Sequence, residues 1–93
     1  MDGRKLREIV EGAKFQKSIA PLRPDAKRLD EALWVVTWAL SRDAEEASWS
    51  MPETGLRVVF TDPFPGLPAL RIFVTVEENS VILQWAEAVP DGT

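Results

Sequence analysis

The sequence limits which side chains could carry chemistry. The chain has 93 residues and contains no histidine, no cysteine and no tyrosine. A serine–histidine–aspartate triad, a thiol nucleophile, a phenolic acid and disulfides are therefore excluded. A structural zinc site would need oxygen ligands alone, which zinc seldom accepts, and no phosphate-binding loop or dinucleotide-binding motif is present. Any catalysis has to rest on arginine, lysine, aspartate, glutamate or serine, and we expect neither a metal nor another cofactor.

The charges are distributed unevenly along the chain. Residues 1–28 hold eight basic and four acidic side chains, whereas residues 29–93 hold three basic and eleven acidic side chains. The formal net charge of −4 argues against nonspecific nucleic-acid binding by the molecule as a whole. Two interpretations stay open: an ordinary solvated helical surface, and a bipolar surface that orients a partner.

The chain is rich in tryptophan for its length, with Trp34, Trp38, Trp49 and Trp85. Trp34 and Trp38 are four residues apart in a predicted helix, on a face displaced from its apolar stripe. Either both belong to the core, or they form an exposed aromatic ridge that receives a partner. We expect at least one of them to remain partly exposed, and both are candidate partner-binding residues.

The spacing of apolar residues predicts helices in the first half of the chain. It favours a helix over residues 3–20, weakened or ended at Gly12, with a short strand over residues 6–11 as the alternative. A second helix is predicted over residues 25–42, with Asp25 as its N-cap. Residues 43–50 are expected to form a polar connector.

Alternating apolar residues predict strands in the second half, over residues 56–61, 70–77 and 80–88. We expect an antiparallel meander with the helix over residues 25–42 on one face. The predicted class is α+β, with N-terminal helices, and a short preceding strand as the alternative, packed on a three- to four-stranded antiparallel sheet. No run approaches the roughly 18 apolar residues that a membrane-spanning helix needs. The N-terminus is charged where a signal peptide needs an apolar stretch, so a cytoplasmic protein without membrane contact is expected.

Three segments resemble the RelE/ParE toxin superfamily of type II toxin–antitoxin modules. Residues 15–22 (FQKSIAPL) resemble its opening helix, and residues 29–43 resemble its second helix and exit. Residues 70–83 are similar to its hairpin, in which an arginine is followed by apolar, aromatic and then acidic residues. The resemblance covers residues 6–87 and implies a single RelE/ParE-like domain over residues 1–93. It also implies a strand, rather than a helix, over residues 6–11.

The resemblance implies a toxin that an antitoxin neutralises, and that acts either by ribosome-dependent mRNA cleavage or by inhibiting DNA gyrase. In cleaving members, basic residues on the central strands and a basic or aromatic residue near the C-terminus serve the reaction. The reaction needs activation of a 2′-hydroxyl, stabilisation of the phosphorane and protonation of the leaving oxygen. Arg71 matches the central-strand arginine and Arg57 lies on the neighbouring predicted strand. The resemblance thus makes Arg71 and Arg57 candidate catalytic residues.

The chain also departs from the pattern of a nuclease. No basic residue, histidine or tyrosine follows Trp85, and the strand half is acidic, which would repel ribosomal RNA. A salt bridge from Arg71 to Glu77, Glu78 or Glu87 is the structural alternative to a catalytic role. These departures favour binding over cleavage. An inactive protein-interaction module and an unrelated small α+β homodimer remain as alternative identities.

Overall fold

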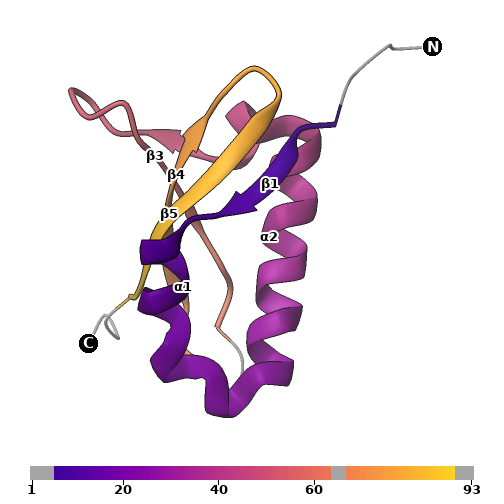
Figure 1. Cartoon of the computed structure of the whole chain (residues 1–93), viewed down its shortest axis with the longest axis vertical. Coiled ribbons are helices and arrows are strands. Elements are labelled where there is room, and N and C mark those ends of the chain that lie inside the picture. Colours follow the sequence, from indigo (N-terminus) through magenta and orange to yellow (C-terminus); the bar gives the residue numbers. More distant parts are fainter. Residues whose placement is uncertain (1–5, 64–66, 90–93) are drawn as a thin grey trace.

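The computed structural model describes residues 6–63 and 67–89, without the side chains of residues 23–26. Figure 1 shows the two main helices forming a hairpin beside the strands, and the short 3-10 helix η1 joining them at the bottom. The predicted α+β class is confirmed. The elements, in chain order, are β1 (Glu8–Glu11), α1 (Ala13–Ile19), η1 (Ala20–Asp25), α2 (Ala26–Ala47), β2 (Trp49–Ser50), β3 (Arg57–Phe60), β4 (Leu70–Val76) and β5 (Ser80–Ala88).

The strands form one five-stranded sheet in the order β1-β5-β4-β3-β2. The predicted meander is confirmed, because β3, β4 and β5 pair consecutively and antiparallel. β2 extends it by a short antiparallel pairing with β3. The prediction of a purely antiparallel sheet is wrong at the other edge, where β1 pairs with β5 in parallel. A parallel neighbour is permitted because the two helices provide a long connection between β1 and the meander.

The helix predicted over residues 3–20 is wrong for its middle part, and residues 3–5 lie outside the described residues. β1 is a strand because its residues pair in register with β5, although Ile9 and Val10 also fit a helical period. The prediction of a helix is correct for α1, Ala13–Ile19. Gly12 separates the two elements: its N–H donates to the Leu83 carbonyl at 2.9 Å, and an added Cβ would lie 3.0 Å from that oxygen.

The second predicted helix is confirmed but is longer than expected. α2 ends at Ala47, so residues 44–47 of the predicted polar connector over residues 43–50 are helical. Asp43 interrupts the helical geometry with φ −154° and ψ 72°. The turn beyond this kink persists because Ala44 is buried in the core. The predicted cap, Asp25, lies among the side chains that are not described.

The core lies between the helices and one face of the sheet. α1 and α2 both contribute to it, and along β4 the buried side chains alternate with partly exposed ones that point away from the helices. Within the described residues, the opposite face of the sheet therefore carries no helix. None of the described helices is both long and apolar enough to span a membrane. The core residues are Phe15, Ile19, Leu29, Leu33, Val36, Leu40, Ala44, Val59, Leu70, Ile72, Val74, Val81, Leu83 and Ala86.

Candidate functional site

The face of the sheet that no described helix covers carries a row of large apolar side chains. Trp49 pairs with Val58, Val58 with Phe73, and Phe73 with Trp85, so these four residues cross β2, β3, β4 and β5 in one line. Residues that are directly opposite in neighbouring strands project from the same face. The row therefore runs across the uncovered face.

A second row lies beside the first, nearer the C-terminal end of β5. Phe60 pairs with Arg71, and Arg71 pairs with Glu87. The rings of Phe60 and Trp49 meet edge to face with centroids 5.7 Å apart, which joins the two rows. We call the residues of both rows the sheet-face cluster: Trp49, Val58, Phe60, Arg71, Phe73, Trp85 and Glu87.

The sheet-face cluster is unusually exposed for aromatic side chains. Trp49 is 63% exposed, Phe60 45% and Trp85 44%, although a small domain gains stability by burying such groups. Contiguous exposed aromatic surface of this kind marks protein–protein interaction sites. The uncovered face can therefore supply aromatic anchors to a partner.

Arg71 is the arginine of this cluster, and its charge is already neutralised. Its Nε and Nη2 both lie 3.0 Å from Oε1 of Glu87, so the salt bridge expected as the alternative to catalysis is formed, with Glu87. The Arg71 guanidinium carbon also lies 6.0 Å from the centre of the Phe73 ring. Both charged side chains remain partly exposed, so the pair offers one donor group and one acceptor group to a partner.

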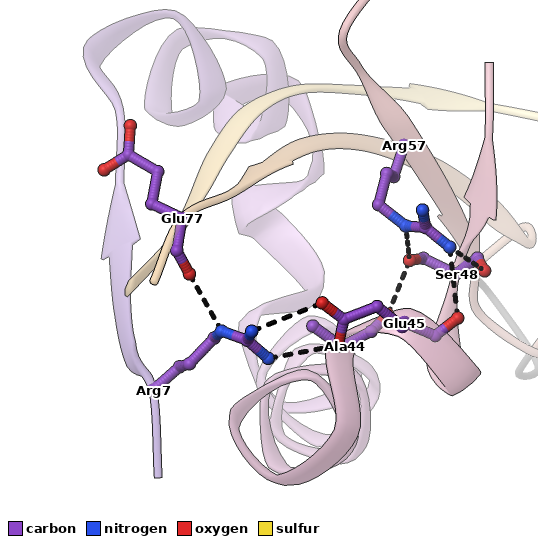
Figure 2. Close-up of polar contacts among 6 residues, drawn as sticks. All are labelled: Arg7, Ala44, Glu45, Ser48, Arg57 and Glu77. Atoms are coloured by element: carbon purple, nitrogen blue, oxygen red, sulfur yellow. Dashed lines mark hydrogen bonds and ion pairs between the residues drawn. The ribbon is translucent and has the colours of Figure 1, made fainter. Parts of the chain in front are cut away.

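Arg57 lies on the opposite face of the sheet from Arg71. It pairs with Val74, whose side chain is buried against the helices. Its Nε donates to Ser48 Oγ at 2.7 Å, and its Nη2 donates to the Ser48 carbonyl at 3.0 Å and to the Glu45 carbonyl at 3.1 Å (Figure 2). These carbonyls lie in the last turn of α2 and just after it, where backbone acceptors have no partner within the helix. Arg57 therefore caps α2.

The two arginines that the resemblance singled out are thus not brought together. They lie on adjacent strands but project to opposite sides, and each is engaged by a different element. A phosphate bound at the sheet-face cluster would contact Arg71 without Arg57.

Figure 2 also shows an ion pair that sequence reasoning missed. Arg7 donates from Nε to the Glu77 carbonyl at 2.8 Å, and its two terminal nitrogens lie 3.2 Å from the carboxylate oxygens of Glu45. The Arg7 backbone N–H donates to the Ser41 carbonyl at 2.9 Å. A hydrogen bond from its own backbone amide, together with the nearby Arg7 guanidinium, lowers the pKa of Glu45. No local pattern links Arg7 to Glu45, because they are far apart in sequence.

The second exposed apolar surface lies on α2 and consists of Trp34, Val35 and Trp38, which we call the α2 ridge. Trp34 is 66% exposed, Val35 57% and Trp38 49%, so the prediction of an exposed tryptophan is confirmed and the core alternative is wrong. The Arg42 guanidinium lies 4.3 Å above the centre of the Trp38 ring. A shallow depression of about 430 Å³ lies beside Trp34 and Val35 and is also lined by Asp30 and Glu31.

The aromatic rows of the sheet face could have been suspected from the alternation in β4, where Arg71 and Phe73 take the positions opposite to the buried residues. No group of three or more acidic, histidine or cysteine side chains that could hold a metal occurs in residues 6–63 and 67–89.

No protein-family model, curated protein or solved structure matches the chain.

Proposed function

We propose that the chain is a divergent RelE/ParE-like toxin, or toxin relative, that acts by binding a cellular protein and does not cleave RNA. In this proposal an antitoxin neutralises it. The observation that carries the proposal is the sheet-face cluster, in which exposed aromatic side chains surround an arginine that is already paired with a carboxylate. The order of strand, two helices and meander supports the family, because the resemblance requires a strand where β1 lies.

Cleavage of RNA is disfavoured by the chemistry of the uncovered face. Arg71 could stabilise a phosphorane only by exchanging Glu87 for the phosphate, and Arg57 projects from the other face. Glu87, which accepts the hydrogen bond from Arg71, would repel a phosphate. The chain has no histidine or tyrosine to move the protons of the reaction.

Binding of a protein is favoured by the same residues. Trp49, Phe60 and Trp85 can act as aromatic anchors, and such side chains supply most of the affinity of many interfaces. The Arg71–Glu87 pair lies beside the aromatic rows, where it can set the orientation of a partner. The resemblance names DNA gyrase as a protein target. From the sheet-face cluster itself we propose a target protein with a complementary apolar surface.

Inducible expression in bacteria tests this proposal. We expect the wild-type chain to arrest growth and Trp85→Glu to abolish arrest, because it places a charge among the aromatic anchors. The matched control is Trp34→Glu, which makes the same change at another exposed tryptophan and should leave arrest intact. Arrest that is lost with Trp34→Glu and kept with Trp85→Glu would move the target site to the α2 ridge. Absence of arrest by the wild type would favour the inactive interaction module.

A further inference from the structure

The α2 ridge lies on the side of its helix that points away from the core. Leu29, Leu33, Val36 and Leu40 of α2 are buried, and the ridge residues occupy the opposite side of the same turns. Val35 of the ridge and Phe60 of the sheet-face cluster line one small pocket, so the two surfaces adjoin at that point.

We propose that the α2 ridge is the interface of a homodimer, in which two copies of α2 pack antiparallel about a two-fold axis at the level of Val36. Such an axis places each residue beside the one equally far from that level on the second copy. Trp34 then lies beside Trp38 of the second copy, and the two copies of Val35 meet close to the axis. The three apolar ridge side chains of one copy pack against those of the other.

The charged residues that flank the α2 ridge favour a second copy of this chain as its partner. Glu31 and Arg42 lie at opposite ends of the ridge, and both lie on the flank of α2 that Val35 occupies. The antiparallel arrangement therefore brings Arg42 of each copy to Glu31 of the other, so the interface contains this pair twice. A parallel arrangement would instead oppose like charges.

These two side chains are free for such a contact. The ion pairs in the described part of the chain are Arg7–Glu45 and Arg71–Glu87, which involve neither Glu31 nor Arg42. The position of the Arg42 guanidinium over Trp38 holds it at the edge of the apolar contact, so little side-chain entropy remains to be lost on pairing.

The length of free helix limits the strength of this dimer. Arg7, just before β1, contacts α2 at Ser41, where its amide donates to the carbonyl, so this segment limits the interface toward the C-terminal end of α2. Two tryptophans per copy, at roughly 150–250 Å² each when fully buried, supply less than the roughly 800 Å² per partner of a standard interface. We therefore expect a dissociation constant on the order of micromolar.

Sedimentation velocity tests the dimer, over concentrations from about 1 to about 500 μM that bracket a micromolar dissociation constant. Glu31→Arg and Arg42→Glu should each weaken the wild-type dimer at least about tenfold, because each opposes like charges twice. The double variant E31R/R42E should restore the dimer. An equimolar mixture of the two single variants should form mixed dimers, since every contact then joins opposite charges. Glu78→Arg, the same reversal on the exposed β4–β5 turn, is the matched control and should leave association unchanged.

Far-UV circular dichroism establishes that each variant is folded, and the positions are exposed enough to tolerate the change. A wild-type chain that stays monomeric over the whole range would overturn the proposal. A dimer that resists both single reversals would overturn it as well, because the contact would then lie elsewhere, for example on the sheet face. Single variants that are monomeric and do not associate on mixing would reject the antiparallel register.

Discussion

Each face of the sheet carries an arginine, but the helices cover only one of the two faces. On the covered face, Arg57 makes three hydrogen bonds to Ser48 and Glu45 and becomes part of the framework. On the uncovered face, Arg71 makes one ion pair with Glu87 and stays partly exposed. Coverage by the helices, rather than the kind of side chain, therefore decides which arginine is structural and which is available to a partner.

The apolar residues of β4 show the same division. Ile72 is fully buried beneath the helices, whereas its neighbour Phe73 lies in the row across the uncovered face. One strand therefore contributes both to the core and to the candidate interface. Variants on the two faces should separate stability from binding.

The largest expected effect on stability comes from the core position. Ile72→Ala should lower the free energy of unfolding by about 2–5 kcal/mol, because it removes buried apolar contacts and leaves a cavity. Phe73→Ala should lower it by about 1 kcal/mol or less, the scale of a cross-strand pair. Urea unfolding of the two variants measures the difference. Equal losses would mean that the uncovered face is as important to the core as the covered one.

The two arginines should differ by a smaller amount. Arg57→Ala should cost about 1.5–3 kcal/mol, since hydrogen bonds from a charged group to the end of α2 are lost. Arg71→Ala should cost less than about 1 kcal/mol, as for an exposed ion pair. Thermal and urea unfolding check this order. If Arg71→Ala proved the more destabilising change, its pair with Glu87 would be structural.

The smallest expected effect concerns Glu45 and acid. Because the pKa of Glu45 is lowered in the folded protein, its ionised form stabilises the fold above its ordinary value of about 4.3, and this contribution disappears as pH falls through the lowered pKa. Glu45→Gln should therefore cost at most about 1 kcal/mol at neutral pH, because the Glu45 side chain is more than half exposed and solvent screens its pair with Arg7.

Urea midpoints measured at neutral and at strongly acidic pH check this dependence. The difference between wild type and Glu45→Gln should be present at neutral pH and vanish in acid. Glu46→Gln, at the next position and also exposed, is the control. A difference that persisted in acid would show that Glu45 acts through packing rather than charge.

The strands of the meander could be predicted closely, since their apolar alternation is local: the last was expected over residues 80–88 and β5 is Ser80–Ala88. The strand β1 could not be decided from its own residues, because its conformation depends on pairing with β5 far along the chain. β2 has two residues, too few for any period to emerge. Short-range patterns thus fix elements that are long enough to contain a period.

The candidate sites divide in the same way. The displacement of Trp34 and Trp38 from the apolar stripe of α2 predicted that at least one of them is exposed, while burial of both in the core stayed open; the structure exposes both. The aromatic rows could only be suspected from the sequence, because the alternation in β4 sets Arg71 and Phe73 apart from the buried residues but does not say which face the helices cover. The separation of Arg57 from Arg71 likewise depends on the register between β3 and β4.

The most direct test of action by binding rather than cleavage is a map of transcript 5′ ends in bacteria that express the chain. We predict that the wild type creates no new 5′ ends and that its map equals that of Arg71→Ala. A nuclease that uses Arg71 would instead give new ends that fall by on the order of a hundredfold in Arg71→Ala, as for loss of one preorganised donor. New ends of that kind would show that the chain cleaves RNA and would contradict action by binding alone.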